Sequence, residues 1–295
     1  MNIDTIAPPA RGELVVVVGP TATGKTALAV ALAERLGGEI VSADSVQIYE
    51  HFDLGSGKPT AAELARAPHH LVSTIGPLAP MDAGRWVQMA DAAIGDITAR
   101  GRVPIVCGGT FLWVKALLRG LAEAPRDETI RARHQAEAQA SGRAALHERL
   151  AAVDPPMAAR LAPNDLVRVS RALEVFELTG KPMSAWQAEH AFATERYAGR
   201  LYGVARERDE IDRRIADRAS SWLAAGWVEE VERLVTAGFG SARAMGSVGY
   251  KEVHAFVRGE LSRDDLLPAI VRATRIFVRR QRTWLRDEAV TWVAG

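Results

Sequence analysis

The sequence has only one cysteine, Cys107, and only five lysines among its 37 basic residues. A single cysteine excludes an internal disulfide and a zinc site built from several cysteines, and it suits the reducing environment of the cytosol. An excess of one charge is also lacking, since 36 acidic residues leave a net charge of +1. We therefore expect any attraction to nucleic acid to come from a local basic patch.

Long hydrophobic runs are absent as well. A membrane-spanning helix needs about 18 consecutive apolar residues, and no segment of this sequence approaches that length. The apolar run at residues 14–18 follows Asp4 and Glu13 and is too short for the core of a signal peptide. We therefore expect a cytoplasmic protein that does not enter a membrane.

The first forty residues predict the fold class. Residues 13–18 form a β-branched run without polar alternation, which is typical of a strand buried on both faces of a parallel sheet. A glycine-rich loop follows, and then a strong helix-forming segment at residues 27–36, which Gly37 and Gly38 end. Residues 39–43 have the pattern of a second strand. This order predicts an α/β fold with a P-loop NTPase-like parallel sheet flanked by helices.

The loop matches the phosphate-binding pattern G-x-x-x-x-G-K-[ST] in full. Its glycines let backbone N–H groups turn toward an anion, the following helix adds partial positive charge, and Lys25 adds a whole charge. Thr26 offers a hydroxyl to a Mg²⁺ ion that bridges phosphate oxygens. We predict that a phosphate or diphosphate binds to Gly19, Pro20, Thr21, Ala22, Thr23, Gly24, Lys25 and Thr26.

Two residues that follow predicted strands complete the candidate site. Asp44 follows the second strand, and Thr110 comes shortly after the strand at residues 103–107. Ligands of open α/β sheets bind at the carboxyl ends of the strands, so both side chains should face the loop. The alternatives are a solvated turn for Asp44 and a helix N-cap over residues 111–118 for Thr110. The strand at 103–107 lacks the terminal Asp or Glu that holds Mg²⁺ in an NTPase or kinase.

The rest of the chain divides by pattern. Residues 125–196 are helical and rich in Ala and Arg, and residues 197–206 have the pattern of a strand that returns to the sheet. We predict a first part of the P-loop core at residues 1–122, a helical insertion domain at 123–197, and a second part of the core at 198–295 that ends in a basic helix.

Five arginines near the C-terminus are spaced 3, 4, 3 and 4 residues apart, which puts them on one side of a helix. We call them the arginine row: Arg272, Arg275, Arg279, Arg282 and Arg286. The opposite side carries the residues that we expect to anchor the helix: Leu267, Ile270, Phe277, Gln281 and Trp284. Such a row is either a solvated surface with ion pairs or a track for nucleic-acid phosphates.

Further motifs occur in order along the chain. They are Gly19–Thr26, Ser42–Tyr49, Gly57–Pro59, Ala67–Leu71, Gly108–Thr110, Arg168–Phe176, Val248–Glu252 and Arg279–Leu285. This ordered set, which spans roughly residues 12–293, resembles the tRNA dimethylallyltransferases. The resemblance implies transfer of a dimethylallyl group from dimethylallyl diphosphate to N6 of the adenosine at position 37 of certain tRNAs.

The resemblance also implies roles for individual residues. The loop holds a diphosphate rather than ATP, Mg²⁺ binds Thr26, and the catalytic residues are Lys25, Asp44 as the general base, and Thr110. Thr110 and Thr23 position the amine and the diphosphate. We expect a monomer that binds the anticodon stem-loop of tRNA through Asp44, Ser45, Val46, Gln47, Thr110, Val167, Arg168, Val169, Ser170, Arg171, Arg275, Arg279 and Arg282.

Two positions depart from that family. Gly246 stands where many members carry Arg or Gln, so that Arg208 or Arg243 would have to supply the missing group, and Val167 stands where Gln is frequent. Three other functions stay open. A P-loop small-molecule kinase would leave the arginine row without a role, and an adenylate prenyltransferase that acts on free nucleotides would need neither the row nor the insertion. A non-catalytic RNA-binding protein would leave Asp44 unexplained.

Overall fold

The computed structural model describes residue 3, residues 6–122 and residues 124–295. It divides into two compact units: unit 1 comprises the described residues up to Leu118 together with Arg196–Gly295, and unit 2 comprises the described part of Arg119–Glu195. These boundaries differ slightly from the predicted 123 and 197. The backbone N–H of Arg196 donates to the Leu118 carbonyl at 2.9 Å, which fixes the return to unit 1.

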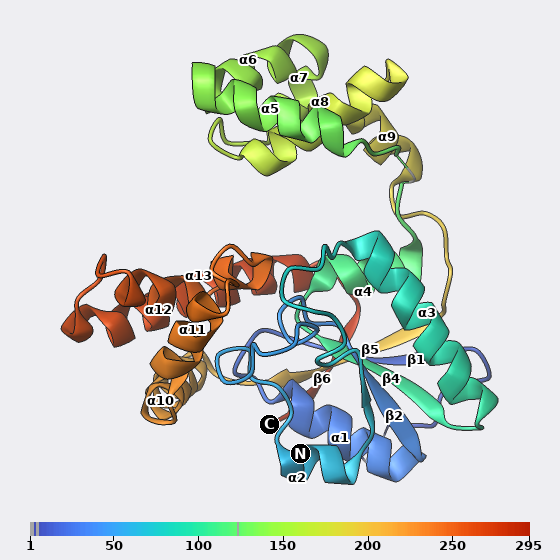
Figure 1. Ribbon diagram of the computed structural model, residues 1–295. Coiled ribbons are helices and arrows are strands. Elements are labelled where there is room, and N and C mark those ends of the chain that lie inside the picture. The colour runs from blue at the N-terminus through green and yellow to red at the C-terminus, as the bar shows by residue number, and fades with distance from the viewer. Residues whose placement is uncertain (1–2, 4–5, 123) are drawn as a thin grey trace. The chain divides into compact units, whose positions relative to one another are not determined.

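Unit 1 is built around a six-stranded parallel sheet with the order β3-β2-β4-β1-β5-β6 (Figure 1). The strands are β1 (Leu14–Val18), β2 (Gly38–Ser42), β3 (His69–His70), β4 (Val103–Gly108), β5 (Gly199–Ala205) and β6 (Val290–Ala294). The predicted α/β fold with a parallel sheet is therefore confirmed. The edge strands β3 and β6 were not predicted, because neither has the apolar run of a central strand.

Helices cover both faces of this sheet, with α1 and α2 on one side and α3 and α4 on the other (Figure 1). The helices of unit 1 are α1 (Lys25–Leu36), α2 (Ala61–Arg66), α3 (Ala83–Ala99), α4 (Phe111–Arg119), α10 (Arg208–Ala224), α11 (Trp227–Thr236), α12 (Tyr250–Val257) and α13 (Arg263–Leu285), with a 3₁₀ turn at Arg243–Gly246. Within the described residues, no helix is both long enough and apolar enough to cross a membrane.

The central strand β1 explains the absence of polar alternation in its sequence. All five of its residues are buried. Val16 belongs to the cluster that contains Trp86 of α3, and Val17 belongs to the cluster that contains Leu28 of α1. Burial of one such valine stabilises the fold by about 1.5–3 kcal/mol. The strand is thus held on both faces, and it fixes where the loop after Val18 begins.

Unit 2 is a small helical bundle. Its helices are α5 (Glu128–Ser141), α6 (Arg143–Val153), α7 (Pro155–Ala158), α8 (Leu166–Thr179) and α9 (Met183–His190). The fully buried Glu174 lies beside Arg131 and Arg171, at 3.0 and 2.7 Å. Burial acts to raise the pKa of Glu174, but hydrogen bonds from the two guanidinium groups and from the Asp127 N–H hold it below the usual value.

Candidate functional site

The glycine-rich loop joins the end of β1 to the start of α1, as its pattern predicts. Gly24 has a φ angle of 100°, and Ala22 has 66°, a region that is unfavourable for a residue with a Cβ atom. Inside the loop, the Lys25 ammonium and the Thr23 hydroxyl both donate to the Pro20 carbonyl, at 2.8 and 2.9 Å. The loop is therefore a strained turn that its own side chains and its neighbours keep in place.

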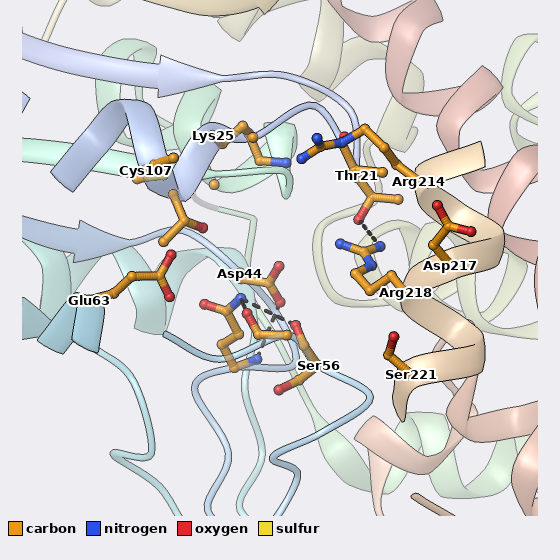
Figure 2. A pocket seen from close by; sticks show the side chains of 17 residues that line it. Thr21, Lys25, Asp44, Ser56, Glu63, Cys107, Arg214, Asp217, Arg218 and Ser221 are labelled. Atoms are coloured by element: carbon orange, nitrogen blue, oxygen red, sulfur yellow. Dashed lines mark hydrogen bonds between the residues drawn. The ribbon is translucent and has the colours of Figure 1, made fainter. Parts of the chain in front are cut away.

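A cavity of about 520 Å³ opens in front of the loop. Figure 2 shows Lys25, Asp44 and Arg218 projecting into it from three different elements. Among the described residues, the backbone N–H groups of residues 23–26 have no hydrogen-bond partner in the protein. Free N–H groups at a helix start attract anions, so the cavity suits a phosphate or diphosphate.

The buried position of Lys25 in the loop changes the pKa of its ammonium group. Burial lowers the pKa of Lys25 to about 8, although the neighbouring Cys107 and Asp44 act to raise it. Burial also raises the pKa of the Cys107 thiol to about 12, so this thiol stays protonated at neutral pH. An anion that enters the cavity would restore the preference of Lys25 for its charged form.

Asp44 faces the cavity before the loop, as predicted, and Thr110 lies against the turn that follows Asp44. The Ser45 N–H donates to Thr110 Oγ1 at 3.1 Å, and the Val46 and Gln47 N–H groups donate to Asp44 Oδ1 at 2.9 and 3.2 Å. Asp44 thus stabilises a turn with one oxygen. Its other oxygen, Oδ2, has no partner among the described residues and is available to accept a proton. The Thr110 hydroxyl binds this turn.

Three arginines on the β5–α10 side hold three successive loop residues. Arg218 Nη2 donates to Thr21 Oγ1 at 3.2 Å, Arg214 Nε donates to the Ala22 carbonyl at 2.7 Å, and Arg206 Nε donates to the Thr23 carbonyl at 2.8 Å. Arg214 and Arg218 also line the cavity. Burial, together with the charge of Arg214, lowers the pKa of Arg218 to about 10, so Arg218 remains a cation at neutral pH.

None of these arginines was predicted as a site residue from the sequence. A signal did exist, because Arg214 and Arg218 are four residues apart on one helix and follow a strand that returns to the sheet. Residues at that spacing share a helix face, and this face lies at the carboxyl ends of the strands.

A second cavity, of about 350 Å³, shares Asp44, Thr21 and Arg218 with the first. Its wall also includes the aromatic side chains of Trp222, Trp227 and Phe277. Asp44 therefore lies where a polar cavity with cationic side chains meets a more apolar one. The predicted residues Ser45, Val46 and Thr110 line this second cavity, and Gln47 lines the first.

Arg208 and Arg243 were the two candidates to replace the side chain that is missing at Gly246. Gly246 lines the second cavity. Arg243 instead donates a hydrogen bond to the Met81 carbonyl, and Arg208 lines a groove between α10 and α13. Neither of them lines the two cavities around Asp44, whereas Arg218 lines both. The cavity that Gly246 lines is thus bordered by two arginines, Arg218 of α10 and Arg280 of α13.

The helix α13 is rotated relative to the predicted orientation. Phe277 and Trp284, which were expected to anchor it, are 38% and 47% exposed. The apolar stripe is shifted because Val278 packs with Ile211 and Ile215 of α10. The buried residues of α13 are Leu266, Ile270, Thr274, Val278, Gln281 and Leu285.

The arginine row lies along the opposite side of α13, as predicted. Arg275, Arg279 and Arg282 line a groove of about 460 Å³. Arg275 is paired with Asp212 at 3.1 Å, whereas no ion pair of Arg279 or Arg282 is found among the described residues. Arg272 lines the same groove and also has no ion pair among the described residues, so the row offers three unpaired cations.

The RNA contacts predicted in unit 2 are only partly on its surface. Val167 is 80% exposed, and Arg168 is exposed beside Asp165 at 3.2 Å. Val169 and Ser170 are buried in the bundle, so their side chains cannot touch RNA. The Arg171 guanidinium is occupied by Glu174 and by the carbonyl groups of Ala124 and Pro125. We therefore withdraw direct RNA contact for Val169, Ser170 and Arg171.

Comparison with known proteins agrees with this geometry. The family model "IPP transferase" matches residues 47–288, and the model "Isopentenyl transferase" matches residues 12–72. A tRNA dimethylallyltransferase of Sorangium cellulosum is 66% identical, with 99% of this chain and 93% of the relative covered.

Two solved structures extend the comparison. A tRNA delta(2)-isopentenylpyrophosphate transferase from Staphylococcus epidermidis is 34% identical, with a TM-score of 0.69 and 98% and 93% of the two chains covered. A eukaryotic dimethylallyltransferase that acts on tRNA shares the fold, with a TM-score of 0.78 at 23% identity. The similarity covers 96% of this chain and 73% of the eukaryotic chain. The chain belongs to the IPP transferase family, as one of its tRNA dimethylallyltransferases.

Proposed function

We propose that this protein, acting as a monomer in the cytoplasm, transfers the dimethylallyl group of dimethylallyl diphosphate to N6 of adenosine 37 in tRNA. The observation that carries this proposal is the place of Asp44, on the wall that two cavities share. The cavity before the phosphate loop suits the diphosphate, and the aromatic cavity suits the flat base. One chain supplies every group of this site, which supports a monomer.

The reaction needs a proton acceptor beside the adenine amine. The bond between the allylic carbon and its diphosphate oxygen breaks, and the electron pair leaves with the diphosphate. N6 then bonds to that carbon, and its proton passes to Asp44 Oδ2, which has no partner among the described residues. A positioned general base typically contributes about 10²–10⁴-fold to the rate. Thr110, which is hydrogen-bonded to the turn after Asp44, lines the cavity that would hold the amine.

The leaving diphosphate gains negative charge as the carbon–oxygen bond breaks. The N–H groups of residues 24–26 and the side chains of Lys25, Arg214 and Arg218 surround its cavity with positive charge. Groups fixed in this way stabilise developing charge without having to reorganise.

Mg²⁺ fits the oxygen donors of this cavity, which include Thr26 and Asp217. No cluster of three or more metal-binding side chains occurs among the described residues. This arrangement suits Mg²⁺, which usually keeps several waters and binds substrate phosphates rather than a cage of protein ligands. When bound at Thr26, it would neutralise charge on the diphosphate oxygens.

The adenine that reacts is normally stacked in the anticodon loop of the tRNA, so it must leave the stack to enter the cavity beside Asp44. Extrusion of a base costs a few kcal/mol, and contacts to phosphates offset this cost. The exposed Arg168 in unit 2 and the unpaired Arg279 and Arg282 in unit 1 are the residues that we assign to such contacts.

The test compares RNA with free nucleotide as the acceptor. The protein is incubated with Mg²⁺ and labelled dimethylallyl diphosphate, and with either total tRNA or AMP. We expect label in tRNA, at an adenosine that nuclease digestion places at position 37, and none in AMP. Label in AMP would instead establish an adenylate prenyltransferase. ATP hydrolysis in the absence of tRNA would establish an NTPase.

A further inference from the structure

The buried side chain of Gln281 connects two parts of the candidate site. Gln281 belongs to α13 and is 5% exposed. Its Oε1 accepts a hydrogen bond from the Thr21 N–H at 2.8 Å, and its Nε2 donates to the Gly109 carbonyl at 3.0 Å. These partners lie 260 and 172 residues away in the sequence, so one side chain joins three distant segments.

The chemistry of the two partners requires an amide at this position. The Thr21 N–H needs an acceptor, and the Gly109 carbonyl needs a donor. Glutamate has no donor for the carbonyl, and methionine offers neither group with useful strength. A Cβ atom at position 109 would lie 2.5 Å from Gln281 Nε2, so glycine there is what permits the approach.

Both hydrogen-bond partners of Gln281 belong to segments that carry residues of the candidate site. The Thr21 hydroxyl accepts a hydrogen bond from Arg218, and Thr21 begins the turn that binds the diphosphate. Gly109 precedes Thr110, whose hydroxyl accepts the Ser45 N–H one residue after Asp44. The length of the Gln281 amide thus sets the spacing between the diphosphate loop and the turn that carries Thr110.

We propose that Gln281 is a positioning residue for the prenyl transfer, and this inference rests on the proposed function. It fixes the diphosphate loop relative to the pair Asp44 and Thr110, so that the allylic carbon and the adenine amine meet at reacting distance. A misplacement of about 1 Å can lower a rate about 100-fold. The groups that bind diphosphate lie within the loop itself and would move with it. Loss of Gln281 should therefore slow the reaction more than it weakens diphosphate binding.

Three variants separate positioning from folding. Gln281→Met keeps the length of the side chain and removes both hydrogen bonds, whereas Gln281→Glu keeps the acceptor for Thr21 and loses the donor to Gly109. The control is Thr283→Val, because the exposed Thr283 hydroxyl bonds only to its own helix, at the Arg279 carbonyl. We would measure the single-turnover rate with saturating dimethylallyl diphosphate and anticodon stem-loop RNA. Inorganic diphosphate affinity by calorimetry and hydrogen exchange of the Thr21 amide complete the set.

For Gln281→Met we expect a rate about 10–100-fold lower, a dissociation constant for diphosphate within about threefold of wild type, and faster exchange of the Thr21 amide. Gln281→Glu should also be slow while its Thr21 amide stays protected, and Thr283→Val should match wild type in all three measurements. A wild-type rate in Gln281→Met, or a loss confined to diphosphate affinity, would overturn the proposal. Should Gln281→Met fail to fold, the rate of Gln281→Glu decides in the same way.

Failure of the proposed function gives a different result. The wild-type protein would then label no RNA, whereas the exchange measurement needs no activity. In that case, an unchanged Thr21 exchange rate in Gln281→Met overturns the positioning role, and a faster rate supports it.

Discussion

The Arg218 guanidinium lies over the ring of Trp222, 4.6 Å from its centroid. A nitrogen of the same guanidinium donates to the Thr21 hydroxyl at 3.2 Å. This one cation therefore contacts both an aromatic side chain of the second cavity and a residue of the phosphate loop. A planar group holds several donors in a fixed geometry, which the single point charge of an ammonium group does not reproduce.

We accordingly expect Arg218→Lys to be far from conservative. It should raise the KM for dimethylallyl diphosphate and lower kcat, because charge-assisted hydrogen bonds are each worth about 1.5–3 kcal/mol, or roughly 10–150-fold. Steady-state kinetics with saturating tRNA would measure both constants. Arg213→Lys, an exposed arginine of the same helix, is the control. Near-normal kinetics in Arg218→Lys would show that Arg218 only braces the loop.

The second prediction concerns the general base. Asp44→Asn keeps an oxygen that can accept the Val46 and Gln47 N–H groups, so the turn should survive. Turnover should fall by about 10²–10⁴-fold, while diphosphate binding stays close to normal. Single-turnover kinetics with saturating Mg²⁺ and substrates would test this, with the exposed Asp96→Asn as the control. Full activity in Asp44→Asn would remove Asp44 from the reaction.

The third prediction is a pH dependence of diphosphate binding. In the free protein the pKa of Lys25 is lowered to about 8, whereas a bound diphosphate stabilises the charged form and raises this pKa. Affinity should therefore be constant below about pH 8 and fall above it, by up to about tenfold for each pH unit, because binding then requires proton uptake. With dimethylallyl diphosphate as the ligand, the last ionisation of the ligand itself, at about pH 6, lies outside this window.

Calorimetry between pH 7 and pH 10 in buffers of different ionisation enthalpy would show the proton uptake directly. Lys25→Met should bind more weakly throughout and lose the slope. An equal slope in both proteins would assign the pH dependence to another group.

The sequence was sufficient for the parts of the site that follow from local chemistry. The loop at Gly19–Thr26 was predictable because its backbone conformation needs glycine at fixed positions, and Asp44 because carboxyl ends of parallel strands share one edge. Arg218 was not predicted, because its role depends on how α10 packs beside the loop. The engagement of the half-buried Arg171 was also missed, since it depends on Glu174, which a helical pattern alone cannot identify as a partner.

Orientation was the least predictable property. The spacing of the arginines predicted which side of α13 is exposed to solvent. The structure nevertheless packs Val278 against α10, whereas Phe277, which was expected to be buried, is exposed. A hydrophobic stripe predicts which side of a helix is buried only to within the width of a side chain. The final rotation follows from the shape of the neighbouring helix.

The fourth prediction concerns packing beneath the second cavity. A Cβ atom at Gly55 would lie 2.1 Å from the Trp227 ring, which is almost fully buried. Gly55→Ala should therefore destabilise the protein by about 1–3 kcal/mol, measured by urea unfolding. Gly76→Ala is the matched control, because nothing lies within 4 Å of a Cβ atom there. Equal stability of the two variants would mean that Trp227 shifts without cost.

The last prediction concerns the arginine row and RNA. Arg279 and Arg282 line the groove beside α10 and have no ion pair among the described residues, whereas Arg275 is engaged by Asp212. Each phosphate contact that is lost should reduce the slope of log affinity against log salt by about 0.7–0.9. The double replacement of Arg279 and Arg282 by Gln should therefore weaken tRNA binding and flatten its salt dependence.

Arg275→Gln should change the slope less, because this cation is already partly neutralised. Dimethylallyl diphosphate binding should be unchanged in all of these variants, since Arg275, Arg279 and Arg282 line neither of the two cavities around Asp44. Arg258→Gln, which removes an exposed arginine at the end of α12, is the control for net charge. Binding measured between 50 and 300 mM salt would decide the matter. A double variant with the wild-type salt slope would show that the row is a solvated surface, and that the RNA phosphates lie elsewhere.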